Sequence, residues 1–165
     1  MTSAMTSALR KPHHPPTPHY PTHPPPAQVF VNKAGHSVAN VDNKKSWALL
    51  LRYRSTMAKV LDSNRKFQAA ADKYFELSQT VSDSVLAEDL LQLLGDAVTC
   101  TILAPASGQR TRLLSLIGSD SRVASLDALP GYAAHSTIIL KMARNEVIQS
   151  ASMVKFESEL KEHQR

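Results

Sequence analysis

The chain has 165 residues, a formal charge of +5 and one cysteine, and these values exclude several classes of protein. A single cysteine rules out an intramolecular disulfide and a multi-cysteine zinc cluster, and no apolar run approaches the ~20 residues that a membrane-spanning helix needs. Residues 1–41 carry +3 of the charge and the remainder only +2, so there is no strongly basic stripe for nucleic acid. Aromatic residues make up only 5%, which favours helices over strands. The sequence therefore predicts an all-α protein with neither nucleic acid nor membrane as a partner.

The first 26 residues hold eight of the ten prolines and four of the seven histidines. Proline lacks an amide donor and clashes with helical geometry, so we predict a disordered Pro/His-rich tail over residues 1–26. Prolines spaced by three, such as Pro12, Pro15 and Pro18, offer docking on an aromatic groove as an alternative. A second alternative is metal binding by the histidines of the tail, although a flexible tract lacks fixed ligand geometry. These histidines are His13, His14, His19 and His23.

From Ala27 onward, apolar residues recur at three- and four-residue intervals, which indicates helices joined by short turns. Gly35, Pro105 and Gly118 are the predicted helix stops, and Asn43 is a predicted N-cap. The predicted helices cover residues 27–34, 44–62, 65–80, 83–104, 109–117, 120–128, 132–143 and 145–163.

The helices at 44–62 and 65–80 form a pair joined by a tight turn. The core face of the second helix is predicted to consist of Phe67, Ala70, Tyr74 and Leu77. A small residue such as Ala70 lets two helices approach closely, and the flanking aromatic rings fill the space beside it. This pair resembles one unit of a tetratricopeptide-type solenoid, with an ordinary helical hairpin as the alternative. Either arrangement gives a surface for packing other helices rather than a reaction site.

The helix at 83–104 has the strongest apolar stripe, which we expect to begin at Leu86. Cys100 lies inside this stripe, so we predict a buried, inert thiol. The acidic residues of the helix are interpreted as a solvated face rather than as a paired-carboxylate acid–base site. They are Asp83, Glu88, Asp89 and Asp96.

No group of residues in the sequence points to a reaction. The five glycines are not clustered into a phosphate-binding loop, and His135 and His163 have no plausible nucleophile beside them. Arg110 and Arg112 are candidates for a phosphate or carboxylate contact, although exposed arginines more often pair with solvent or a nearby acid. We therefore predict no catalytic residue, no cofactor, no metal site and no enzyme activity.

The stretch from Cys100 to Leu114 (CTILAPASGQRTRLL) closely resembles a segment of the subunit-four family of the COP-nine signalosome, a family of PCI-domain proteins. Three further stretches agree in the same order. They are Ala27 to Ala34 (AQVFVNKA), Ala58 to Ser78, and Phe156 to Gln164. Together the four stretches extend the resemblance over about residues 27–165.

The resemblance implies a helical-repeat arm over residues 27–104, followed by the start of a PCI-type helical region over residues 105–165. It also implies a non-catalytic scaffold subunit that supports deneddylation of cullin–RING ubiquitin ligases in the nucleus and cytoplasm. The implied partners are other signalosome subunits and cullin–RING ligases.

The family chain is longer at both ends, and its winged helix would follow Gln164, so we expect a fragment without the winged helix. An open solenoid end exposes an apolar edge for the next module. The candidate interface residues are Arg110, Arg112, Val154, Phe156 and Leu160. Two alternatives remain: a PCI subunit of the proteasome regulatory-particle lid, which has a segment like Ile102 to Pro105, and a free-standing helical adaptor.

Overall fold

The structure is a computed structural model that describes residues 26–38, 47–80 and 85–165. Every regular element in these ranges is helical, which confirms the predicted all-α class. The tail predicted for residues 1–26 lies outside the described residues except for Pro26, and so does the predicted N-cap Asn43. The elements are α1 Pro26–Val38, α2 Trp47–Ser63, α3 Phe67–Ser78, α4 Ala87–Leu103, α5 Gly108–Gly118, η1 Ser121–Ala128, α6 His135–Ala143, α7 Ser150–Glu159 and η2 Glu162–Gln164, where η marks a 3-10 helix.

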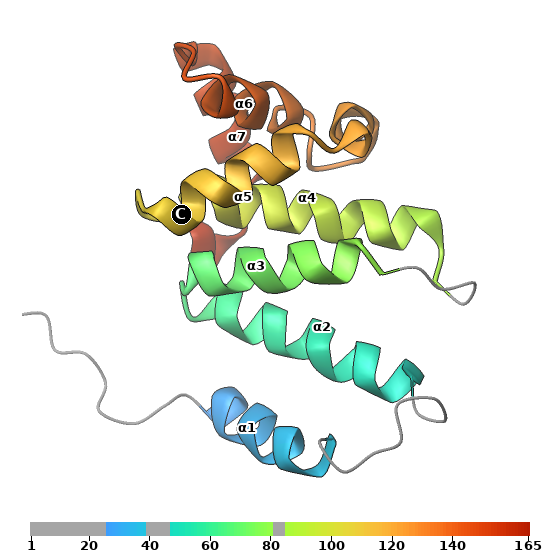
Figure 1. Cartoon of the computed structure of the whole chain (residues 1–165). Coiled ribbons are helices and arrows are strands. Elements are labelled where there is room, and N and C mark those ends of the chain that lie inside the picture. The colour runs from blue at the N-terminus through green and yellow to red at the C-terminus, as the bar shows by residue number, and fades with distance from the viewer. Residues whose placement is uncertain (1–25, 39–46, 81–84) are drawn as a thin grey trace, which may run out of the picture.

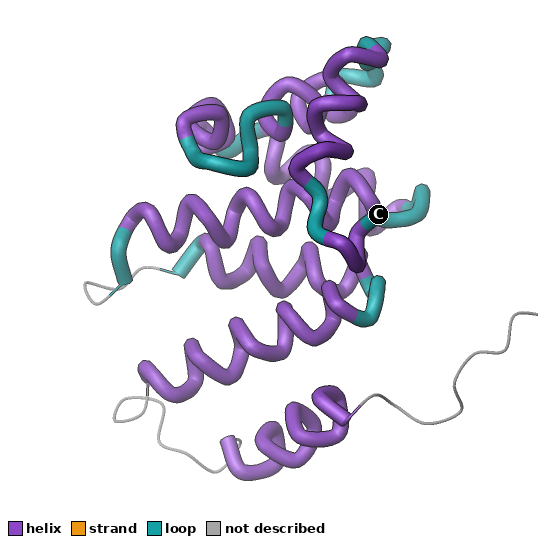
Figure 2. Tube along the Cα trace, turned by 180° about the vertical axis from the view of Figure 1, so that it is seen from behind, coloured by secondary structure: helices purple, strands orange, loops and turns teal. Residues whose placement is uncertain are grey.

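Helices α1 to α5 are stacked in chain order, and each contacts the next (Figure 1). Helices α2, α3 and α4 alternate in direction, so α2 and α4 run the same way. Beyond α5 the chain continues into α6 and α7, and it then returns across the stack until η2 contacts α2 (Figure 2). This return brings the last residues beside helices that precede them by about a hundred positions.

The main core lies between α2, α3, α4 and α5. Phe67, Ala70, Tyr74 and Leu77 are all buried against the facing sides of α2 and α4. Ala70 has no exposed surface, so α3 packs closely against its neighbours there. The turn between α2 and α3 closes at Arg65, whose φ of 58° lets the Lys66 amide donate to the Leu61 carbonyl at 2.9 Å.

A second, smaller core joins α6 to α7. It contains Ala134, Ile138, Phe156 and Leu160, with Ile102 and Leu103 of α4 packed against it. Because Ile102 and Leu103 also pack against the main core, the end of α4 links the two cores. Pro105 follows this end, and α4 stops at Leu103 as the sequence predicts.

Three predictions about the helices themselves are wrong. Gly35 does not end its helix, because α1 continues to Val38. The glycine instead makes room for Tyr53 of α2, since a Cβ at Gly35 would lie 2.7 Å from the Tyr53 hydroxyl oxygen. Leu86 does not begin the buried stripe of α4, because it caps that helix in an extended conformation and is 70% exposed.

The third error concerns residues 145–163, which do not form one helix. Helix α7 covers only Ser150–Glu159, and Leu160 and Lys161 are extended, with ψ values of 142° and 157°. The break lets Leu160 enter the second core while Lys161 and Gln164 reach back to α4 and α2. The three- and four-residue spacing of apolar residues continues past the end of α7, because Phe156 before the break and Leu160 at the break are both buried in the second core.

Candidate interaction site

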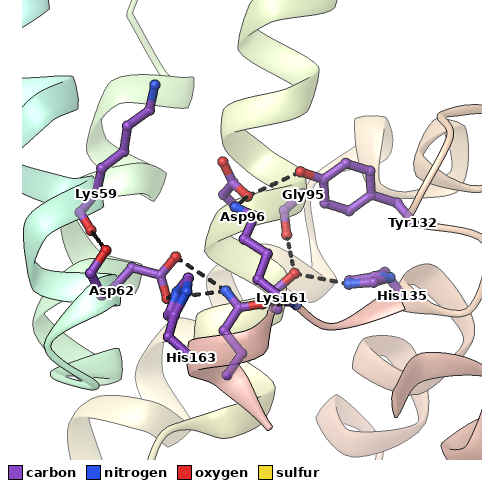
Figure 3. Close-up of polar contacts among 11 residues, drawn as sticks. Lys59, Asp62, Gly95, Asp96, Tyr132, His135, Lys161 and His163 are labelled. Carbon is purple, nitrogen blue, oxygen red and sulfur yellow. Dashed lines mark hydrogen bonds and ion pairs between the residues drawn. The ribbon is translucent and has the colours of Figure 1, made fainter. Parts of the chain in front are cut away.

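Polar side chains from four parts of the fold meet where the C-terminal segment Leu160–Arg165 crosses α2 and α4 (Figure 3). Asp62 comes from the end of α2, and Asp96 and Thr99 come from α4. Tyr132 and His135 come from the turn before α6 and from its first residue. The segment itself contributes Lys161, His163 and Gln164. We call this group the C-terminal clasp.

Asp62 is buried and is the first anchor of the clasp. The Gln164 side-chain amide donates to both Asp62 carboxylate oxygens, at 3.0 and 3.1 Å. The Lys161 backbone amide donates to the Gln164 side-chain oxygen at 3.1 Å and thereby orients that side chain. His163 Nε2 also lies 3.1 Å from Asp62 Oδ1, within ion-pair range but without hydrogen-bond alignment. The buried carboxylate is therefore compensated mainly by residues at the far end of the chain.

Asp96 is the second anchor and is 9% exposed. Its Oδ1 atom accepts from the Tyr132 hydroxyl at 3.0 Å and from the Lys161 ammonium at 3.1 Å. Burial and the nearby Asp96 charge raise the pKa of the Tyr132 phenol, so the hydroxyl stays protonated and donates. The Tyr132 ring lies against α4 because Gly95 has no side chain: a Cβ there would be 2.6 Å from the ring. Asp96 is thus buried in the clasp, which corrects its assignment to a solvated face, whereas Glu88 and Asp89 are exposed.

His135 is buried beside the clasp, with its ring against Tyr132 and Phe156 at centroid distances of 5.0 and 4.9 Å. Its Nε2 atom lies 2.8 Å from the Thr99 hydroxyl, which itself donates to the Gly95 carbonyl. Because that hydroxyl has only one proton to donate, we assign the proton of the neutral ring to Nε2. The opposite atom, Nδ1, lies 3.4 Å from a Glu159 carboxylate oxygen. Burial nevertheless lowers the pKa of His135, against the raising effect of Glu159.

Three other residues that the sequence singled out, Cys100, Arg110 and Arg112, lie outside the clasp. Cys100 is fully buried, and burial raises the pKa of its thiol. Arg110 donates to the carbonyls of Thr101 and Ile102, at 2.9 and 3.0 Å, and so caps the end of α4. Arg112 is exposed on α5.

The predicted apolar edge at α7 is not formed as expected. Phe156 is 2% exposed and Leu160 is 9% exposed, because both side chains pack into the second core. Val154, which is 66% exposed, is the one member of the three that lies on the surface. Of the candidate interface residues, the structure therefore leaves Arg112 and Val154 available to another molecule.

Sequence reasoning missed most of the clasp. It contains buried polar residues that lie up to 102 positions apart, so no local pattern connects them. A weak signal was present, because Asp62 and Asp96 each sit next to core positions of apolar helices. Among residues 26–38, 47–80 and 85–165, no three His, Cys, Asp or Glu side chains gather as metal ligands. None of the helices described is long and apolar enough to cross a membrane.

The stacked helices, the two joined cores and the exposed faces define an all-helical repeat protein. The chain is 35% identical over 144 residues to COP9 signalosome complex subunit 4 of Arabidopsis thaliana, a match that covers 84% of this chain and 34% of the relative. It is 33% identical to the subunits of the same name from Caenorhabditis elegans and Drosophila melanogaster, over 84% of this chain and 31% of each relative.

These matches confirm the resemblance seen in the sequence. The chain spans about a third of the length of the curated relatives it matches. No protein-family model matches it.

Proposed function

We propose that this chain belongs to the subunit 4 family of the COP9 signalosome and acts as a non-catalytic scaffold subunit. In this role it holds other signalosome subunits and supports deneddylation of cullin–RING ligases, in the nucleus and cytoplasm. The observation that carries the proposal is the similarity to subunit 4 from a plant, a nematode and a fly, at 33–35% identity across most of this chain.

The fold supports a scaffold role through its stacked arrangement. Helices that each contact the next in the chain form extended outer faces, and such stacks present long surfaces for other proteins. Large apolar side chains remain exposed on several helices, among them Phe30 on α1 and Val154 on α7. Exposed apolar residues of this size are typical of surfaces that other proteins cover.

The titratable residues of the interior also favour a non-catalytic role. Asp62 and Asp96 are engaged in holding the C-terminal segment, and His135 packs between two aromatic rings. The thiol of Cys100 is buried and its pKa is raised, so the reactive thiolate is disfavoured. Each of these groups therefore has a structural role that is sufficient to explain its position.

The test is affinity purification of the tagged chain from the cells that produce it, followed by mass spectrometry. We expect the other signalosome subunits to be recovered with it. We expect Arg112→Glu to reduce their recovery, because this exposed arginine is available to an acidic surface of a neighbouring subunit. The matched control is Lys66→Glu, a change from a basic to an acidic residue at an exposed position that makes no ion pair within the described chain.

Other outcomes identify the alternatives. Recovery of proteasome lid subunits in place of signalosome subunits would contradict the proposal and support membership of the related PCI complex. Recovery of a single unrelated partner would support a free-standing adaptor.

A further inference from the structure

A groove with a volume of about 630 Å³ opens between α2 and α4. Leu51 and Leu93 lie at its bottom, since both are half-buried and pack against the main core. The two helices run in the same direction, so residues at the start of α2 face residues at the start of α4 (Figure 1). The groove is a separate feature from the clasp, and its residues play no part in the family assignment or the proposed function.

The two walls of the groove carry charged side chains of opposite sign at the same spacing along their helices. On α2 the wall is formed by Arg52, Ser55 and Lys59. On α4 the wall is formed by Asp89, Gln92 and Asp96. Both sets have the same spacing of three and then four residues, which places each set along one face of its helix.

The walls do not close onto each other. Within the described chain, no ion pair within 4.0 Å joins Arg52 or Lys59 to the acidic wall. The side chains are instead separated by the groove, which leaves room for a segment of another chain between them. Arg52 and Lys59 on one side and Asp89 on the other make no ion pair within the described chain. With the apolar floor between them, they form a surface that is complementary to a ligand carrying both signs.

The chain itself shows how this surface is used. Where the C-terminal segment crosses α2 and α4, the extended residue Lys161 donates to Asp96, the last member of the acidic wall (Figure 3). Two residues of the same segment contact Asp62, one turn beyond Lys59 on α2. At this end of the groove, an extended residue, Lys161, therefore already contacts the acidic wall of α4 with its basic side chain.

We propose that the open part of the groove binds an extended segment of a partner protein in which acidic and basic side chains alternate. In an extended chain, successive side chains point to opposite sides, so the acids would face Arg52 and Lys59 while the bases face Asp89. The span from Arg52 to Lys59 is about 10 Å along the helix, which is about three extended residues. The methylene stems of these side chains would cover Leu51 and Leu93. A segment of one charge would meet a like charge on one wall.

The experiment uses the full chain and a fluorescein-labelled ten-residue peptide of alternating Glu and Lys. A second peptide has the same composition arranged as one acidic and one basic block. Alternation places like charges four residues apart, which disfavours a helix, whereas the block arrangement favours one. We expect saturable binding of the alternating peptide by fluorescence polarisation, at least about tenfold tighter than that of the block peptide.

Arg52→Glu/Lys59→Glu should weaken binding of the alternating peptide by at least about tenfold. The control is Lys66→Glu/Lys155→Glu, with the same change in net charge at two exposed positions outside the groove, and it should bind as the parent does. Circular dichroism is to be recorded for each variant, and only variants with the helical content of the parent are compared. Equal loss in both variants, or no saturable binding up to about 1 mM, would overturn the proposal. Preference for the block peptide would also overturn it, in favour of a helical occupant. None of these outcomes depends on co-purification with the signalosome, so the two proposals can fail separately.

Discussion

At the scale of single residues, the buried Asp62 carboxylate is the most informative group in the molecule. A carboxylate transferred from water into the interior costs free energy unless hydrogen bonds replace its hydration. Here the replacement comes from Gln164, whose amide contacts both carboxylate oxygens. The stability of the α2 end and the position of the last residues are therefore coupled.

We predict that Asp62→Ala lowers the free energy of unfolding by about 1–3 kcal/mol, because it leaves the buried Gln164 amide without its partner. Gln164→Ala should have a comparable effect, and the double variant should cost less than the sum, with a coupling of about 0.5–3 kcal/mol. Urea unfolding measures all four proteins. The control is Asp72→Ala at an exposed position of α3, expected within about 0.5 kcal/mol of the parent. Strict additivity would mean that the clasp is not formed.

The buried His135 predicts a dependence of stability on pH. Burial lowers its pKa in the folded state, so the unfolded chain binds the proton more readily. The contribution of the neutral ring is present above about pH 6.5 and is lost as the pH falls below that value. Asp120, whose pKa the Arg122 hydrogen bond lowers to about 2, acts in a separate and more acidic range. The groups that face the ring are Thr99, Glu159, Tyr132 and Phe156.

His135→Gln should therefore flatten the loss of stability between about pH 7 and pH 5, relative to the parent. Urea unfolding at several pH values gives the slope for each protein. His36→Gln, at an exposed position of α1, should keep the slope of the parent. A slope that is unchanged by His135→Gln would show that this ring does not titrate differently in the folded and unfolded chain.

At the scale of elements, the α2–α3 pair depends on how closely the two helices approach. Ala70 has no exposed surface, whereas its neighbour Ala69 points to solvent on the same helix. We predict that Ala70→Leu destabilises the fold by about 1–3 kcal/mol, because the added carbons force the helices apart. Ala69→Leu adds the same atoms without a neighbour and should change stability by less than about 0.5 kcal/mol. Thermal denaturation compares the two, and equal melting temperatures would contradict this packing.

Tyr74, on the same helix, stabilises the core by packing alone. Its ring is fully buried and its hydroxyl has no hydrogen-bond partner within the described chain. The ring therefore contributes to stability by packing, and the hydroxyl contributes no hydrogen bond within the described chain. This explains why the sequence pattern, which records only size and apolar character, identifies the residue correctly.

At the scale of the whole molecule, stability should decrease from the centre of the stack toward α1. Helices α3 and α4 pack against each other along their length and hold most of the main core, whereas α1 contributes Val31 as its one buried apolar residue in the described chain. We predict that hydrogen exchange is slowest for amides in α3 and α4 and much faster in α1, through local opening. Protection in α1 equal to that in α4 would contradict this order.

The sequence by itself determined the helical class, the positions of most helices and the core of the α2–α3 pair. These features follow from local sequence signals: apolar residues at three- and four-residue steps specify one buried face, and Pro105 disfavours helical geometry in the residue before it, so that α4 ends at Leu103. The resemblance to a known family could also be read from short, contiguous stretches such as Cys100 to Leu114. These signals are all carried by neighbouring residues.

Only the tertiary structure decided the C-terminal clasp, the break after α7 and the groove between α2 and α4. Asp62 and Gln164 are 102 positions apart, and their pairing depends on the path of every helix between them. The same holds for Gly35 and Gly95. The absence of a side chain at these positions makes room for the rings of Tyr53 and Tyr132, which approach from other elements. Local patterns report which face of a helix is apolar, but the polar contacts that join distant helices depend on geometry that arises only when the whole chain is packed.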